Sequence, residues 1–313
     1  MAERRLIGLA LLALLSIVAF MTIGLRGNIA FALELRSVRL VALVQVAVAI
    51  AISTVLFQTV TGNRILTPSI MGLDALYLFV QTALVFVFGG LGFAALDPSL
   101  KFGGEVAIMI ALALALFLPM LFSRMDMGLM LLGGVILGVL FRSLSSLLAR
   151  LIDPNDFAVV QGASFASFNS INSELVALGT ILTIVAVIVA WRSRHVLDIL
   201  ALGGDTATGL GVEWRRTVAG LIMLVAVLVA VSTALVGPVA FFGLLVVALA
   251  ERVVDSRRHR YMLPAAALTA IIVLVGGQTL LQHALGGAST LGVVIEFVGG
   301  AVFLILLLGT RKR

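Results

Sequence analysis

Long apolar stretches dominate the chain, and charged residues or Gly-Pro pairs separate them. A helix needs roughly 20 apolar residues to cross the hydrocarbon core of a bilayer, and most of these stretches have about that length. The run over 218–254 is too long for one crossing, and Gly237-Pro238 interrupts it. The pattern therefore predicts about ten membrane-spanning helices, which we place at 6–25, 38–60, 70–91, 104–122, 127–149, 171–191, 217–236, 239–254, 261–281 and 292–310.

The composition agrees with an all-α polytopic membrane protein whose single transmembrane domain covers residues 1–313. Hydrophobic residues make up 62% of the 313 residues and charged residues 12%, whereas a soluble domain has about 45–50% and about 25%. A β-barrel would alternate apolar with polar residues, and this chain does not. Neither Lys101 nor Lys312 follows the glycine spacing of a phosphate-binding loop. If ATP drives the protein, another chain must hydrolyse it, and we expect no catalytic residue here.

The distribution of basic residues predicts the orientation in the membrane. With an even number of spans, 15 of the 21 basic residues lie on the side that holds both termini, and six lie on the other side. The positive-inside rule then places both termini in the cytoplasm and accounts for most of the net charge of +6 without a nucleic-acid partner. Two connections are too long to be simple turns, one outside over 150–170 and one in the cytoplasm over 192–216.

The ionisable residues predict neither a metal site nor hydrolysis. The three histidines, His195, His259 and His283, fall in three different connections, so we expect solvated side chains without a metal.

Asp205 follows two glycines, and we expect it to cap a short helix.

An ion-coupled carrier would place ionisable groups in the middle of its spans. The candidates Asp74, Glu174 and Glu296 all lie toward predicted span ends, where water can reach them. The sequence therefore gives little support to a proton relay.

Glycines indicate how the spans pack. Gly134 and Gly138 have the spacing that lets helices approach closely, and we expect them to pack within the chain rather than between subunits. Gly/Pro-interrupted stretches follow the second and seventh spans, at 62–68 and 237–243, which run in opposite directions. Such paired breaks are typical of an inverted repeat, here of spans 2–5 and 7–10.

Five segments, in this order, resemble the permease subunits of ABC importers for ferric siderophores, haem and cobalamin: 58–72, 202–212, 237–244, 259–265 and 299–303. The second contains Leu202-Gly203-Gly204-Asp205-Thr206-Ala207 followed by Leu210-Gly211, which is similar to the family's cytoplasmic docking element. The Asn63-Arg64 pair, where many members have Asn-Pro, looks like the branch that serves ferric catecholate-type siderophores.

The resemblance implies a type II ABC importer permease fold in the bacterial cytoplasmic membrane. It also implies the partners: an ABC ATPase dimer that hydrolyses ATP, an extracytoplasmic siderophore-binding protein, and a second permease chain, identical or paralogous. No cofactor is expected in the permease itself.

The resemblance also implies two sets of site residues. Within the coupling loop 192–216, the residues expected to dock on the ATPase are Gly203, Asp205, Ala207, Leu210 and Gly211. The residues expected along the translocation path are Asn63, Pro68, Phe165, Phe168, Gly237 and Pro238. For the two phenylalanines, an aromatic belt at the membrane interface is an equal alternative. An ion-coupled secondary transporter, active without an ATPase, is the alternative function.

Overall fold

The structure is a computed structural model that describes residues 1–25, 28–122, 127–168, 172–284 and 291–309. Its described residues form thirteen helices and no strand. The helices are α1 (Ala2–Thr22), α2 (Ile29–Thr61), α3 (Leu73–Ala95), α4 (Pro98–Phe122), α5 (Met127–Ala149), α6 (Pro154–Ala163), α7 (Ser173–Arg192), α8 (Arg194–Leu200), α9 (Gly204–Gly209), α10 (Trp214–Val236), α11 (Phe242–Val254), α12 (His259–Ala284) and α13 (Leu291–Gly309).

The all-α polytopic prediction is confirmed. Eight helices, namely α1 to α5, α7, α10 and α12, are long and apolar enough to cross a membrane. Two more apolar helices, α11 and α13, occupy the remaining predicted spans, which gives eight to ten crossings. Helix α11 has only 13 residues, about 20 Å of helix, so it is shorter than a bilayer core of about 30 Å.

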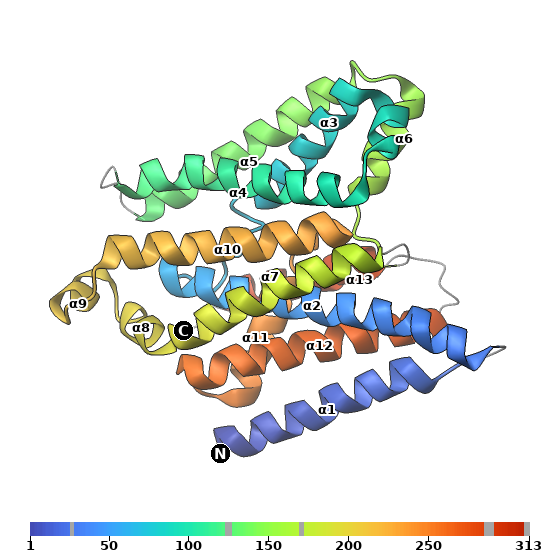
Figure 1. Cartoon of the computed structure of the whole chain (residues 1–313). Coiled ribbons are helices and arrows are strands. Elements are labelled where there is room, and N and C mark those ends of the chain that lie inside the picture. The colour runs from blue at the N-terminus through green and yellow to red at the C-terminus, as the bar shows by residue number, and fades with distance from the viewer. Residues whose placement is uncertain (26–27, 123–126, 169–171, 285–290, 310–313) are drawn as a thin grey trace.

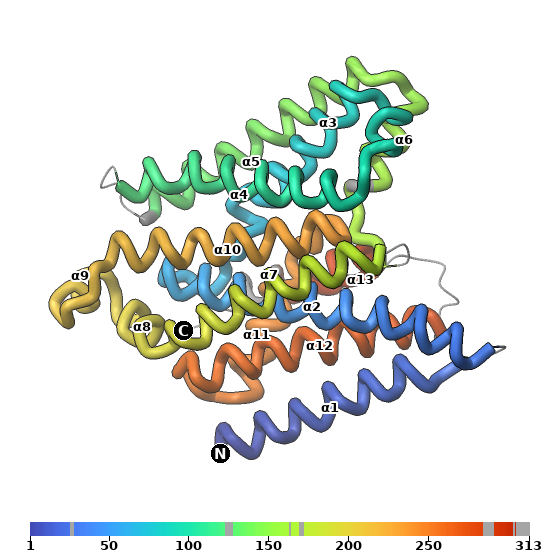
Figure 2. The backbone as a smooth tube through the Cα atoms, viewed as in Figure 1, coloured from blue at the N-terminus to red at the C-terminus, as the bar shows by residue number. Residues whose placement is uncertain are grey.

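The long helices lie side by side, as Figures 1 and 2 show. Helix α2 is central and contacts α7, α10, α11 and α12. Helices α3, α4 and α5 form a group that joins the rest through α10, and α1 covers α12 at the other edge (Figure 1). The short helices α8 and α9 lie at the same end of the bundle as the N-terminus of α1, and α6 lies toward the opposite end (Figure 1).

Two interruptions divide the bundle where the sequence predicts them. The first follows α2, where Gly62 and Gly72 have positive φ of 62° and 91°. The second follows α10, where Gly237 and Phe241 have positive φ of 95° and 57°. Glycine adopts such angles without a steric penalty, so Gly62, Gly72 and Gly237 allow the chain to turn at these points. Gly72 also packs against the backbone of Gly134 and Gly138 in α5. The prediction that Gly134 and Gly138 make a contact within the chain is therefore confirmed.

Several helices start earlier than predicted, and α6 forms where no helix is predicted. Helix α2 starts at residue 29 rather than 38, and Arg36 in this added part donates hydrogen bonds to the Phe20 and Ile23 carbonyls at 2.9 and 2.7 Å. Those carbonyls belong to the end of α1, which has no helical partners for them. Helix α6 forms inside the predicted outer connection, because Asp153 accepts a hydrogen bond from the Asn155 backbone at 2.9 Å and Pro154 occupies the first turn.

Candidate functional site

Helices α8 and α9 form a compact element between α7 and α10. Leu197 and Leu200 of α8 and Ala207 of α9 point into the protein and are buried. Gly203 and Gly211, with φ of 101° and 85°, turn the chain before and after α9. The Val212 amide donates to the Ala207 carbonyl at 3.0 Å and closes the second turn.

The predicted coupling residues divide into an outer and an inner group. Asp205 and Leu210 are exposed, as are the two turn glycines, and Leu210 is 60% accessible. Ala207 is 0% accessible, so its methyl group packs inside the bundle. The expectation that Asp205 caps α9 is wrong: the N-cap is Gly203, and Asp205 lies in the first turn. There a carboxylate still favours the helix dipole.

A buried polar network joins α8 to the rest of the bundle. Asp198 Oδ1 accepts a hydrogen bond from the His259 backbone amide at 2.8 Å and lies 2.7 Å from its ring Nδ1. The other ring nitrogen, Nε2, lies 2.7 Å from the Thr59 hydroxyl in the last turn of α2. His259 is only 4% exposed, so the prediction of a solvated histidine is wrong here. A buried ring needs partners for both nitrogens, and this one has them.

Ion pairs surround this network at the same end. Arg64 lies 3.6 Å from Glu251, Arg5 lies 3.9 Å from Asp255, and Arg260 lies 3.5 Å from Glu3. These pairs connect the starts of α1 and α12 with the end of α11 and the segment after α2. A cavity of about 270 Å³ lies beside them and is lined by, among others, Thr59, Arg64, Glu251, Arg257 and His259.

The predicted path residues do not gather at one place. Asn63 is exposed near the α8 end, where its side chain accepts a hydrogen bond from the Ile65 amide at 3.0 Å. Pro68 is buried in the middle of the bundle. Gly237 packs closely against the backbone of Phe165 and Ala166. A Cβ atom at this position would lie 3.1 Å from the Phe165 carbonyl oxygen, so a larger residue would fit poorly.

The rest of this predicted set lies beside that contact. Pro238 and Phe168 are buried, whereas Phe165 is 48% exposed. The structure therefore brings the outer connection and the second interruption together, and leaves Asn63 apart.

The two interruptions meet around one small cavity. It is lined by Thr67 to Ser69 and Asp74 on one side and by Val239, Phe241 and Gly243 on the other. Asp74 is buried, so the expectation that water reaches it at a span end is wrong. The reason is that α3 begins inside the bundle, after the 62–72 segment, rather than at the membrane surface. Glu174 is exposed, as expected.

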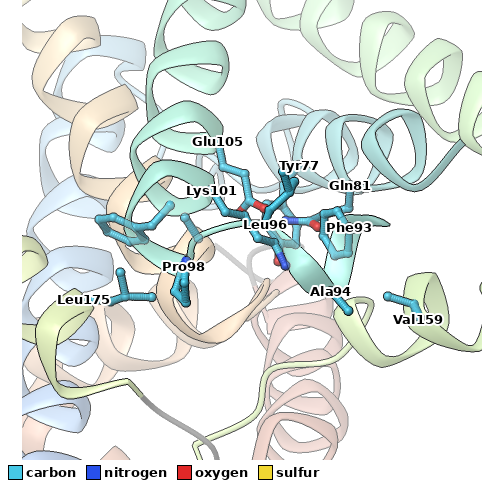
Figure 3. A pocket seen from close by; sticks show the side chains of 12 residues that line it. Tyr77, Gln81, Phe93, Ala94, Leu96, Pro98, Lys101, Glu105, Val159 and Leu175 are labelled. Atoms are coloured by element: carbon cyan, nitrogen blue, oxygen red, sulfur yellow. The ribbon is translucent and has the colours of Figure 1, made fainter. Parts of the chain in front are cut away.

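One buried acid escaped the sequence analysis. Glu105 of α4 is 2% exposed and faces a cavity between α3 and α4 (Figure 3). The predicted fourth span begins at residue 104, where a carboxylate is typical of a boundary. Helix α4 starts nearly two turns earlier, at Pro98. The paired charges Lys101 and Glu105, one helical turn apart, were the available signal.

Comparison with known proteins covers nearly the whole chain. Residues 6–309 match the profile of the FecCD transport family. The petrobactin import system permease protein YclO of Bacillus subtilis is 41% identical over 307 residues, which are 96% of this chain and 98% of that protein. The petrobactin import system permease protein FatC of Bacillus anthracis is 34% identical over 280 residues, which are 89% of this chain and 78% of that protein.

A solved structure has the same fold. It is an inward-facing conformation of a metal-chelate type ABC transporter, with a TM-score of 0.85 at 20% identity, and the match covers 98% of this chain and 99% of that chain. The predicted type II ABC importer permease fold is thereby confirmed.

Proposed function

The chain belongs to the FecCD transport family, and we propose that its cargo is a ferric siderophore of the catecholate type. As a member of this family it is the permease subunit of an ABC importer and not an enzyme, because ATP is hydrolysed on a partner chain. The observation that supports this cargo assignment is the 41% identity to a petrobactin import permease over almost the whole chain. The Asn63-Arg64 form of the segment after α2 supports the same branch.

Family membership also decides between the two transport mechanisms. An ion-coupled carrier would work alone, whereas permeases of this family work with an ATPase. The secondary-transporter alternative is therefore not retained.

The proposed orientation places the α8–α9 end in the cytoplasm of a bacterial cell and α6 outside. This end carries exposed arginines on several elements, and the positive-inside rule favours such an end in the cytoplasm. They are Arg64, Arg192, Arg215, Arg216, Arg252, Arg257, Arg258 and Arg260. The whole chain, 1–313, then forms one permease domain in the cytoplasmic membrane, with 192–216 as its coupling loop.

The proposed contact with the ATPase is the exposed face of α9 and its flanking turns. We define this coupling surface as Leu202, Asp205 and Leu210; both leucines are about three-fifths exposed, at 61% and 60%. Apolar side chains that project from a charged end are typical of the core of a protein interface. The turn glycines Gly203 and Gly211 shape this surface, and Ala207 holds it from behind.

The network behind α8 gives the coupling surface a rigid connection to the path. Asp198 joins α8 to His259 at the start of α12 and, through the ring, to Thr59 of α2. Helix α2 continues into the 62–72 segment, which reaches the cavity between the two interruptions. A displacement of α8 by the ATPase would thus reach the interruptions through hydrogen-bonded and packed residues.

The proposed path runs between two permease chains, which together bind the extracytoplasmic siderophore-binding protein. On the outer side, the exposed Phe165 ring offers an aromatic surface to a catecholate. In the middle, Pro68 and the Gly237-Pro238 turn hold the two interruptions, and Phe168 packs nearby. Asn63 is exposed at the cytoplasmic end, where cargo would leave.

The cargo is tested by uptake into proteoliposomes that contain the complete importer. Labelled ferric catecholate should enter, and excess unlabelled ferric catecholate should compete, whereas a ferric hydroxamate or cobalamin should not. Equal competition by a hydroxamate would contradict the catecholate assignment.

The coupling surface is tested separately. Leu210→Asp should abolish copurification of the ATPase and leave the melting temperature of the permease unchanged, because the side chain is exposed. A matched control is Val253→Asp, an exposed apolar residue at the same end on α11. Normal copurification with Leu210→Asp, or equal loss with the control, would remove this surface from the coupling mechanism.

A further inference from the structure

A cavity of about 340 Å³ lies between α3 and α4 (Figure 3), at the end of the bundle that holds α6 and lies opposite α8 and α9 (Figure 1). Val159 of α6, Leu175 of α7 and Ala234 of α10 complete its wall. Its volume is in the range of small-molecule sites, and it is separate from the cavity between the two interruptions. None of the residues assigned to coupling or to the path lines it.

A buried carboxylate faces this cavity with no counter-ion within ion-pair distance among the described residues. Glu105 is 2% exposed, and its Oε1 has no hydrogen-bond partner among the described residues. Gln81 and Tyr77 lie in the same wall of the cavity as Glu105. A buried carboxylate that lacks a counter-ion is destabilising, so this site favours a positively charged group.

The protein's own nearby cation is held elsewhere. Lys101 lies one turn before Glu105, yet its Nζ sits 3.5 Å from the centroid of the Phe93 ring, and no ion pair with Glu105 is present in the described structure. The two opposite charges therefore face the same cavity from one helix and remain separate. A ligand with one positive and one negative group would satisfy both.

The rest of the wall favours an ammonium near Glu105. The last residues of α3, including Ala94, line the cavity together with Leu96 just beyond them. The final carbonyls of a helix lack intrahelical partners and carry partial negative charge. The Tyr77 ring adds an aromatic face, which attracts cations.

We propose that this cavity binds a phosphoethanolamine group, with the ammonium at Glu105 and the phosphate at Lys101. In the proposed orientation the cavity lies at the outer ends of the spans, where the head groups of the outer leaflet are found. The group can come from phosphatidylethanolamine or from free phosphoethanolamine, because both present the same charges.

The test is native mass spectrometry of the purified permease complex with equal amounts of phosphatidylethanolamine, phosphatidylcholine and phosphatidylglycerol. Phosphatidylethanolamine should be retained about tenfold more than the other two, because the other head groups lack a primary ammonium. Glu105→Gln should abolish this preference, and Lys101→Gln should weaken it. Glu174→Gln, an exposed acid at the start of α7, is the matched control and should bind as the parent does.

A second arm separates the two sources. If free phosphoethanolamine raises the melting temperature of the parent but not of Glu105→Gln, while no lipid is retained, the ligand is the soluble molecule. If Glu105→Gln does not fold, Phe93→Leu tests the same wall and should also reduce the preference. Equal retention of the three lipids with no effect of phosphoethanolamine, or the parent's preference in Glu105→Gln, would overturn the proposal.

Discussion

Replacing Asp198 with alanine should release α8 from the start of α12. The carboxylate accepts a hydrogen bond from the His259 backbone at 2.8 Å and contacts the ring nitrogen at 2.7 Å, and its side chain is 34% exposed. Alanine removes both interactions and leaves two buried nitrogen groups without a partner. The rest of α8 is held by the buried Leu197 and Leu200 and by the partly buried Val196 and Ile199.

The structure sets the size of the effect. A hydrogen bond to a charged group contributes about 1.5–3 kcal/mol. Because Asp198 is partly exposed, water can replace part of this contribution, so we expect a total of about 2–3 kcal/mol for the local opening of α8. That corresponds to a roughly 30- to 140-fold larger equilibrium constant for the opening of α8, since about 1.4 kcal/mol is a factor of ten.

Hydrogen–deuterium exchange of the purified permease complex measures this opening directly. Peptides that cover α8 and the first turn of α12 should exchange faster by that factor, while peptides from the middle of α2 should not change. Asp198→Asn keeps one acceptor oxygen and should give an intermediate rate. In the assembled importer, Asp198→Ala should retain ATP hydrolysis but transport less cargo per ATP.

Asp255→Asn is the matched control. Asp255 is an exposed acid at the same end, and its pair with Arg5 is 3.9 Å long, so it should contribute about 0–1 kcal/mol. Unchanged exchange of α8 in Asp198→Ala, or an equal increase in Asp255→Asn, would refute the role of the network.

Three further predictions concern packing and the ends of helices. Gly138→Leu should lower the stability of the permease by about 1–3 kcal/mol in thermal unfolding, because the Gly138 backbone packs directly against Gly72. The control Gly104→Ala should leave the stability unchanged, because a Cβ atom there meets open space. Gly243→Val should be similarly destabilising, because a Cβ there would overlap Thr54, and an unchanged melting temperature would contradict this packing. Arg36→Gln should speed exchange in the last turn of α1, which loses donors to its carbonyls; no change would show that the turn is held by other interactions.

The spans and their breaks could be predicted from sequence because both depend on local physics. Apolar length decides which segments cross a bilayer, and Gly62, Gly72 and Gly237 allow turns that other residues resist. The start of α2 was missed because Arg36 is charged, and its partners are carbonyls of another helix. Such a tertiary contact leaves no periodic pattern in the sequence.

The site was only partly predictable for a related reason. The docking element was located by resemblance, but which of its side chains face outward depends on how α9 packs on α10, so the burial of Ala207 was not foreseen. His259 was expected to be solvated, because its partners Asp198 and Thr59 are 61 and 200 residues away along the chain. Glu105 was missed because charge near a span end usually indicates a boundary.

ATP-dependent uptake tests the central claim most directly. The permease is reconstituted in liposomes with the binding protein and labelled ferric catecholate, once with the active ATPase and once with an ATPase that binds but cannot hydrolyse ATP. We predict that the label accumulates only with the active ATPase. Accumulation by the permease without ATP hydrolysis would contradict the assignment of this chain as an ABC importer permease.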